Sequence, residues 1–488
     1  MNHTDTSKEE IPSEQCQTPP EPIPDHLFED ICQHYEELMD HPYKYLFSAS
    51  QWLRWYHHYQ QQSDTFALKL MRRVVQSGTL HAFRTLQFVP QDFHHDVNTR
   101  SCNDNNIDIN YNINNYIYNN LGQEGSSKDA NNVDNMKVNI NKEELIQSAC
   151  HVQYYSDQLA AKCISESLKV RPIFGKTKIS IFEGDCLEVA IHLLKTLKSS
   201  SVTTSSATSN VTPLSVVDTS SFSSSQQSLD EKNKSFIHKK NKKNSFRKET
   251  VSTNSKTIDS TCQEPPLDFE NDSCPSDMVV VVEQFKVALL NMASAKRPGG
   301  GYREGAGSQE ENLFRRTSLA FSLEDIESYD SQRQWYYPIE KHGGVYVPSV
   351  QVIRGSESKG YPFLNEIYTL DVVCVAALRT PKLDHTGTRI DASLVDTVRR
   401  KIRLIFAMAL QHGVTHLVLS AFGCGAYRNP PQHVAQLFKQ VLMQEFDGKF
   451  AQVIFAIYND ANAWRRGDGG NVEPFEKEFG IKASVFEK

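Results

Sequence analysis

The sequence predicts an α/β layer sandwich, and three observations carry that prediction. Strand-like runs alternate with amphipathic helices along the second half of the chain. Two buried strands end in close-set glycines, and α/β sheets bind ligands outside the carboxyl ends of their strands. Polar tracts separate these segments, and mean hydropathy is -0.50, so only part of the 488 residues is expected to form a packed core.

Composition divides the chain into segments of different character. They are a disordered lead over 1–24, a helical region over 25–100, an Asn-rich insert over 101–142, the start of the folded domain over 143–198, a disordered Ser/Asn/Lys-rich insert over 199–276, and the rest of the domain over 277–488. In the helical region, Trp52, Trp55 and Tyr56 have the spacing of a core stripe, and we assign them no chemistry. The basic run 238–248 has two readings, a nuclear import address or a charged stretch without function.

Periodicity predicts the elements of the folded domain in order. Strands are expected over Lys178–Phe182, Met278–Val282, Phe285–Met292, Tyr346–Ile353 and Leu370–Ala377, with a final strand over Val453–Asp460. Helices are expected over Glu143–Leu168, Leu187–Leu197, Glu310–Arg316 and Ala392–Gln411, and another from about Pro430.

The first glycine loop follows the strand that ends near Asn291. It contains three consecutive glycines, Gly299–Gly301, and leads to two adjacent acids, Glu310 and Glu311, where a helix begins. Bare backbone lets successive N–H groups approach a phosphate, so a diphosphate is the expected ligand. Neighbouring helical positions point about 100° apart, so one carboxylate is expected to bind and the other to react. The alternative is an ordinary turn whose acids complement a helix N-terminus.

The second glycine loop follows a buried strand within Leu417–Pro431. Gly423 and Gly425 are followed by Tyr427, and two such loops at strand ends can hold the two sides of one diphosphate. We interpret Cys424 as a small packed residue of this loop, since no base lies in register to make it a nucleophile.

Other classes of site are excluded or disfavoured. The chain has no G-x-x-x-x-G-K-[ST] motif and no Cys/His cluster at zinc spacing. A net charge of -7 argues against a general nucleic-acid-binding surface, although a local basic patch is possible. Its candidates lie around the first loop, Lys296, Arg297, Arg303, Arg315 and Arg316, and the alternative for each of them singly is a solvated face. Ten cysteines without a C-x-x-C pair and no signal or membrane segment predict reduced thiols in a protein of the nucleus and/or cytoplasm.

The two loops together resemble a known family. Gly299–Gly301, a short spacer and Gln309-Glu310-Glu311 resemble the signature of poly(ADP-ribose) glycohydrolases. Asn291 with Ala293-Ser294, and the segment YVPSVQVIR, resemble the microbial-type branch. The resemblance covers roughly 176–460 outside the Ser/Asn/Lys-rich insert. Where the family has a Pro-Ala-Pro-Asn run, this chain has Ala377-Leu378-Arg379-Thr380.

The resemblance implies a fold and a reaction. The fold is a macrodomain-like three-layer α/β/α sandwich with a mixed sheet. The reaction is hydrolysis of the ribose-ribose O-glycosidic bond, with Glu311 as general acid and base and Glu310 orienting ribose hydroxyls. The alternatives are a reader of ADP-ribose that hydrolyses nothing and a hydrolase of mono-ADP-ribosylated protein.

The resemblance also implies binding residues. Asp185 is expected to accept from the adenine amino group, with simple capping of the following helix as the alternative. Tyr427 is expected to press on the terminal ribose, and Tyr458 to stack on adenine. The remaining substrate-binding candidates are Asn291, Gly299, Gly300, Gly301, Gln309, Gly423, Cys424, Gly425 and Ala426. We expect a monomer that needs no cofactor or metal and binds poly(ADP-ribose) and ADP-ribosylated proteins, but neither membranes nor specific nucleic-acid sequences.

Overall fold

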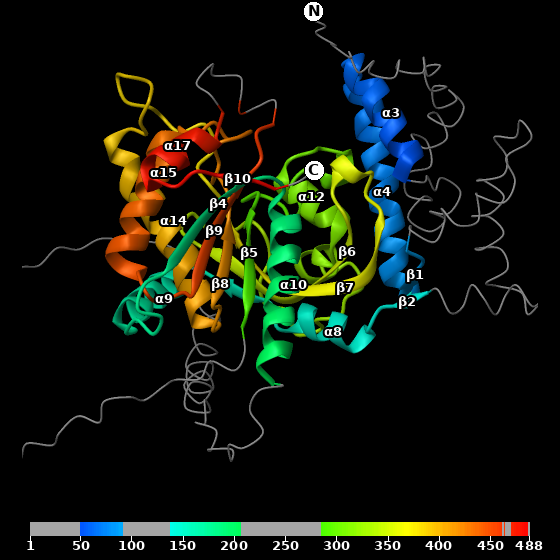
Figure 1. Cartoon of the computed structure of the whole chain (residues 1–488), viewed down its shortest axis with the longest axis horizontal. Coiled ribbons are helices and arrows are strands. Elements are labelled where there is room, and N and C mark those ends of the chain that lie inside the picture. The colour runs from blue at the N-terminus through cyan, green and yellow to red at the C-terminus, as the bar shows by residue number, and fades with distance from the viewer. Residues whose placement is uncertain (1–48, 91–136, 206–284, 461–462, 464–469, 487–488) are drawn as a thin grey trace, which may run out of the picture. The chain divides into compact units, whose positions relative to one another are not determined.

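The computed structural model describes residues 49–90, 137–205, 285–460, 463 and 470–486 (Figure 1). Described residues before 201 and after 284 group into one compact unit by their contacts. The predicted strand 278–282, the basic run 238–248 and the lead 1–24 lie outside the described residues.

An eight-stranded mixed sheet forms the centre of the fold. Its order is β10-β4-β9-β8-β5-β7-β6-β3. The strands are β3 (Gln153–Tyr155), β4 (Lys178–Glu183), β5 (Val287–Met292), β6 (Gly344–Arg354), β7 (Phe363–Val375), β8 (His416–Leu419), β9 (Gln452–Ile457) and β10 (Ser484–Val485). Neighbours from β10 to β7 are parallel, and β6 and β3 are antiparallel to their neighbours. The carboxyl ends of the parallel strands therefore share one edge.

Helices cover both faces of the sheet and make the layers of a sandwich (Figure 1). One face packs against α9 (Asp157–Lys169), α14 (Ala392–Gln411), α15 (Pro431–Val441) and α17 (Val472–Phe479). The other packs against α8 (Lys142–Cys150), α10 (Cys186–Ser205), α12 (Gln309–Arg316) and α13 (Leu319–Leu323). The predicted three-layer α/β fold with a mixed sheet is confirmed.

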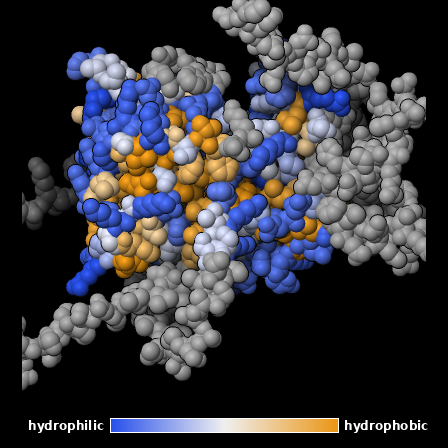
Figure 2. Space-filling view, viewed as in Figure 1, coloured by the Kyte–Doolittle hydropathy of each residue, from blue (hydrophilic) through white to orange (hydrophobic). Residues whose placement is uncertain are grey.

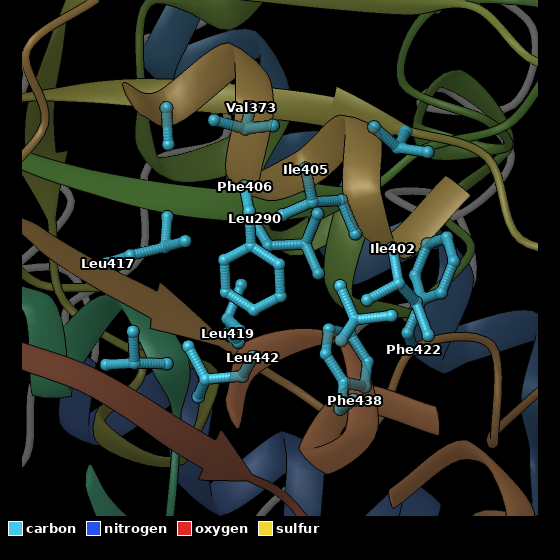
Figure 3. Packing of buried hydrophobic residues seen from close by; sticks show 14 of the residues in the cluster. Leu290, Val373, Ile402, Ile405, Phe406, Leu417, Leu419, Phe422, Phe438 and Leu442 are labelled. Carbon is cyan, nitrogen blue, oxygen red and sulfur yellow. The ribbon is translucent and has the colours of Figure 1, made fainter. Parts of the chain in front are cut away.

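Aromatic and aliphatic side chains fill the layer between the sheet and α14. Phe406 of α14 meets Phe438 of α15 edge to face, with ring centroids 6.2 Å apart, over Leu419 of β8 (Figure 3). Burying such side chains stabilises the fold by about 1.5–3 kcal/mol each. On the outer surface, hydrophilic side chains cover most of the helices, and hydrophobic ones gather over β4, β9 and α14 (Figure 2).

The segment before the sheet contributes two helices, α3 (Ala49–Gln61) and α4 (Thr65–Thr85). The Asp64 side chain caps α4 by accepting from the N–H groups of Phe66 and Ala67 at 3.0 Å each. Beyond α4, β1 (Gln87–Phe88) pairs with β2 (Val138–Asn139). The 3-10 helices η4 (Tyr302–Glu304) and η5 (Glu357–Lys359) and the π-helix η6 (Leu442–Phe446) complete the described elements.

Three boundaries differ from the expectations. The helix expected over 143–168 is two helices separated by β3, because a strand of three residues is too short to show a period. The strand expected over 453–460 ends at Ile457, and β10 follows it, so it is not the final strand. The strand expected from Leu370 begins at Phe363. Its first residues were missed because they are partly exposed and do not form a continuous apolar run.

Candidate active site

The two glycine loops lie together because β5 and β8 are neighbours in the sheet. Both strands run in the same direction, so the loop after Met292 and the loop after Leu419 leave from the same edge. Asp185 and Tyr458 also directly follow the ends of parallel strands at that edge, β4 and β9. The topology thus brings four sequence-distant segments to one place, as α/β sheets do for ligands.

Gln309 joins the first turn of α12 to the end of β5. Its side-chain oxygen accepts from the N–H of Met292 at 2.9 Å, and its side-chain nitrogen donates to the carbonyl of Leu290 at 2.7 Å. These two hydrogen bonds resemble those that a neighbouring β-strand would make with the backbone of β5. Gln309 therefore fixes the origin of the helix that carries the two glutamates, rather than presenting its amide to a ligand.

Glu310 is buried and holds the first loop. Its carboxylate accepts from the N–H of Ser294 at 2.7 Å and from the N–H of Gly299 at 3.2 Å. The Asn291 amide lies 3.5 Å from the same carboxylate. Only 4% of the residue is exposed. Burial raises the pKa of Glu310 to about 8; the N–H of Ser294 opposes the shift, and the neighbouring charge of Glu311 adds to it.

This pKa predicts how stability depends on pH. The fold favours protonated Glu310, so its contribution to stability is present in full below about pH 4.3, the usual value, and is lost as the pH rises towards about 8. Relative to Glu310→Gln, the wild-type free energy of unfolding is expected to fall by roughly 1–4 kcal/mol between pH 5 and pH 8. Urea unfolding of both proteins at the two pH values measures this. A constant or growing wild-type advantage would contradict it.

Glu311 differs from Glu310 in having one unpaired oxygen. Its Oε1 accepts from the N–H of Gly301 at 2.9 Å. Its Oε2 is buried and has no hydrogen-bond partner among the residues that the structure describes. The residue as a whole is 8% exposed. As the sequence predicted, adjacent positions on α12 give the two carboxylates different surroundings. Glu310 is held by several donors, and Glu311 keeps an oxygen for another partner.

The first glycine loop serves the glutamates rather than an open phosphate cradle. The N–H groups of Gly299 and Gly301 donate to Glu310 and Glu311, and the N–H of Gly300 donates to the carbonyl of Arg297 at 3.3 Å. In this conformation none of the three is free for a diphosphate. The expectation that these amides bind the diphosphate directly needs this correction, because sequence shows bare backbone without showing which acceptor lies opposite.

The second glycine loop does offer free amides. The successive N–H groups of Gly425, Ala426 and Tyr427 have no acceptor within the described part of the chain. A Cβ built on Gly425 meets no atom within 4 Å, and Ala426 is exposed, so this stretch faces open space. The Asn429 amide fixes the loop by donating to the carbonyls of Gly423 at 3.0 Å and Leu378 at 2.7 Å. Successive free amides of this kind form an anion-binding concavity.

Tyr427 lies where the two loops meet. Burial raises the pKa of its hydroxyl, the charge of Glu310 adds to the shift, and a hydrogen bond with the Ser294 side chain opposes it. The charge of Glu311 contributes in the same direction as Glu310. The charges of both carboxylates therefore act on Tyr427.

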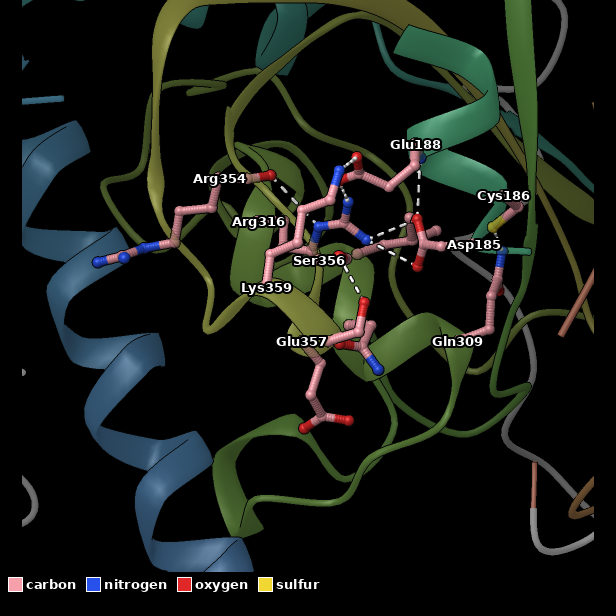
Figure 4. A network of polar contacts seen from close by, with 12 residues as sticks. Asp185, Cys186, Glu188, Gln309, Arg316, Arg354, Ser356, Glu357 and Lys359 are labelled. Carbon is pink, nitrogen blue, oxygen red and sulfur yellow. Dashed lines mark hydrogen bonds and ion pairs between the residues drawn. The ribbon is translucent and has the colours of Figure 1, made fainter. Parts of the chain in front are cut away.

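Asp185 is held by a buried arginine. Arg316 donates to both carboxylate oxygens of Asp185 at 2.9 Å and to Glu188 at 2.8 Å (Figure 4). Asp185 also accepts from the N–H of Glu188 at 2.9 Å, so it does cap α10. Its side chain keeps 30% exposure, which leaves room for a further donor. Tyr458 is about half exposed, and its pKa is raised by partial burial and by the charges of Glu357 and Asp185, so the charge of this carboxylate acts on it.

The expected basic patch around the first loop is wrong for most of its members. Arg315 and Arg316 are fully buried. Arg297 pairs with Glu304 at 2.8 Å, and Arg303 pairs with Glu324 at 2.6 Å. Arg297, Arg303 and Arg316 pair with carboxylates of the protein itself, and Arg315 donates to the Tyr361 hydroxyl at 3.2 Å, which residue spacing alone does not reveal.

Cys424 is a buried thiol of the second loop, as expected of a packed residue. No cluster of three His, Cys, Asp or Glu side chains suited to a metal ion occurs within the ranges 49–90, 137–205, 285–460 and 470–486. In those same ranges no helix has the length and apolar character of a membrane span.

Two residues of the site were missed at the sequence level. Ser294 binds Glu310 through its N–H, and only its place in the Ala293-Ser294 motif marked it. Tyr337 has a buried hydroxyl without a partner among the described residues. Burial, then the neighbouring Cys374 and Glu310, raise the pKa of Tyr337 well above its ordinary value. Nothing in the local sequence signals Tyr337, since it comes from a loop far along the chain.

Fold and site together define an α/β sandwich protein with a buried glutamate pair between two glycine loops. Residues 214–355, less than a third of the chain, match the family model described as the microbial-type PARG (poly(ADP-ribose) glycohydrolase) catalytic domain. The matched segment contains the glycine and glutamate motifs, so the match confirms the resemblance that these motifs predicted. No curated protein sequence matches the chain.

Several solved structures are similar to the chain. One is the poly(ADP-ribose) glycohydrolase of Thermomonospora curvata, with 20% identity, a TM-score of 0.47, and coverage of 84% of this chain and 99% of that one. The same enzyme bound to the inhibitor ADP-HPD has 18% identity, a TM-score of 0.45 and the same coverage. The Deinococcus radiodurans enzyme in complex with ADP-ribose has 19% identity, a TM-score of 0.40, and coverage of 70% of this chain and 98% of that one.

Proposed function

We propose that this protein is a poly(ADP-ribose) glycohydrolase that cleaves the ribose-ribose O-glycosidic bond and releases ADP-ribose. The observation that carries the proposal is the unequal pair of buried carboxylates. Glu310 is held by the N–H groups of Ser294 and Gly299, whereas Glu311 retains an unpaired oxygen beside Tyr427. The match of residues 214–355 to the microbial-type catalytic domain supports the same activity.

The chemistry assigns successive duties to Glu311. In its protonated form it donates to the ribose oxygen of the leaving chain while an oxocarbenium-like centre develops on the other sugar. In its ionised form it takes a proton from the water that attacks that centre. The N–H of Gly301 holds the other oxygen of Glu311 throughout, so the carboxyl does not rotate away. Glu310 stays in place to bind ribose hydroxyls.

The macrodomain-like sheet edge offers a place for each part of an ADP-ribose unit. The free N–H groups of residues 425–427 suit the diphosphate. Tyr427 suits the terminal ribose because it follows the second glycine loop and the charges of both glutamates act on it. Asp185, with its exposed carboxylate edge, suits the adenine amino group, and the exposed ring of Tyr458 suits the adenine face. The physiological partners would then be poly(ADP-ribose) and ADP-ribosylated proteins.

Digestion of polymer by the purified full-length protein tests the function. ADP-ribose should accumulate from poly(ADP-ribose), whereas a reader would bind polymer and release nothing. A parallel reaction with mono-ADP-ribosylated protein separates the third possibility: release from that substrate alone would show a mono-ADP-ribosyl hydrolase. Binding of ADP-ribose by calorimetry is common to all three and serves only to show that the site is intact.

A further inference from the structure

Helix α4 packs directly on the loop that delivers the glutamates. A Cβ on Gly305 would collide with the backbone carbonyl of Lys69. A Cβ on Gly307 would lie 2.6 Å from the guanidinium carbon of Arg72. These two glycines thus allow close contact between the loop and α4, and they present no bare backbone to a ligand. We propose that Arg72 of α4 is a positioning residue that sets the start of α12 and thereby the place of the Glu311 carboxylate.

A closed chain of contacts connects Arg72 to the start of α12. Arg72 donates to Glu357 of η5 at 2.6 Å and 3.3 Å. Glu357 accepts from the Tyr361 hydroxyl, which also lies 2.5 Å from the side-chain oxygen of Asn312. The Asn312 amide in turn donates to the carbonyls of Gly307 at 3.2 Å and Ser308 at 3.3 Å. The circuit closes because Gly307 packs on Arg72 itself.

The circuit supplies what the cap of α12 lacks. Ser308 is the N-cap residue, yet its side chain makes no capping hydrogen bond. Two other sets of contacts hold the N-terminal turn of α12. Gln309 binds the backbone of β5, and Asn312 connects the Arg72–Glu357 pair to the carbonyls of Gly307 and Ser308. Glu310 and Glu311 lie in that turn, so a shift of its origin moves both carboxylates. Displacing a reacting group by about 1 Å can cost as much as 100-fold in rate.

The other end of α12 is also tied to α4. The Thr79 hydroxyl donates to the carbonyl of Arg315 at 2.6 Å, and Arg354 donates to the same hydroxyl at 2.8 Å. Helix α4 therefore contacts both ends of α12. Helix α4 lies outside residues 214–355, the segment that matches the catalytic-domain model. The residues that position the glutamates would therefore extend beyond that segment.

The chain provides a matched control for Arg72. Arg84, on the same helix, pairs with Glu327 at 2.8 Å, but its side chain is 32% exposed against 15% for Arg72, and it lies on the last turn of α4, away from Gly307. Arg72→Met and Glu357→Gln each break the circuit, and Arg84→Met removes an arginine–glutamate pair of the same helix without touching it. Because the inference rests on the proposed function, one readout is kinetic and the other is independent of activity.

For the full-length protein, Arg72→Met and Glu357→Gln are expected to lower kcat on polymer by roughly 10-fold or more, with KM and the ADP-ribose Kd within about 2-fold of wild type. Hydrogen exchange of peptides spanning 299–312 should speed up in both variants and stay at the wild-type rate in Arg84→Met. Equal exchange and equal kcat in the Arg72 and Arg84 variants would overturn the inference. A wild type without hydrolytic activity would overturn the proposed function instead, and the exchange data would still decide the role of Arg72.

Discussion

Glu311→Gln is expected to lower kcat for polymer hydrolysis by roughly 10²–10⁴-fold, the usual contribution of a general acid-base residue. Glutamine keeps the shape of the side chain and can still accept from the N–H of Gly301 through its amide oxygen. It cannot give a proton to a leaving oxygen or take one from water. Single-turnover release of ADP-ribose, measured against wild type, gives the loss directly.

Two comparisons make this result specific to the chemistry. The ADP-ribose Kd of Glu311→Gln, by calorimetry, should remain within a few-fold of wild type. Glu304→Gln is a control on the same loop, since Glu304 is exposed and only pairs with Arg297, and it should keep full activity. The kcat of Glu310→Gln should fall less than that of Glu311→Gln, because Glu310 orients the substrate and does not transfer a proton. An active Glu311→Gln protein would refute the mechanism.

Gly300→Ala is expected to reduce activity by roughly 100-fold or more by displacing the glutamate pair. Gly300 has φ +56°, and a Cβ there would lie 2.6 Å from Glu311 Oε1 and 3.0 Å from Glu310 Oε2. Either the loop or the carboxylates must move, and the N–H of Gly301 then loses its alignment with Glu311. Initial rates on polymer and the ADP-ribose Kd measure the effect.

Gly387→Ala is a control that separates the steric clash at Gly300 from the backbone strain of a positive φ. Gly387 has φ +70°, and a Cβ there meets nothing within 4 Å. Both substitutions therefore pay a similar conformational cost of roughly 1 kcal/mol, and only Gly300→Ala inserts a methyl group beside the carboxylates. Gly387→Ala should keep wild-type rates despite some loss of stability. Matching rate losses in the two variants would show that the contacts at Gly300 do not matter.

The strands and the glycine loops could be predicted because their signals are local. Buried strands such as Val287–Met292 appear as apolar runs, and Ala392–Gln411 shows both a helical period and a stop signal at Gly413. The motif of three glycines followed by Gln309-Glu310-Glu311 also lies in one short stretch, and the match of residues 214–355 confirms the resemblance it predicted.

The partners of the site residues could not be predicted, because they come from distant segments. Arg316 was a candidate for a basic patch or a solvated face, yet it is buried against Asp185, more than a hundred residues earlier. Gly299 and Gly301 were expected to offer their N–H groups to a diphosphate, and these groups donate to Glu310 and Glu311. No local pattern distinguishes these outcomes, since an arginine or glycine has the same sequence signature in either case.

By itself the sequence determined the fold class, the two loops and the glutamates between them, since spacing along a chain fixes what each short segment can become. Only the tertiary structure decided which glycine amides are occupied and which are free. The N–H groups of Gly299 and Gly301 turn to the glutamates, and those of residues 425–427 remain open. The physical reason is that a hydrogen bond depends on the position of its acceptor, and that position is set by how the strands and helices pack.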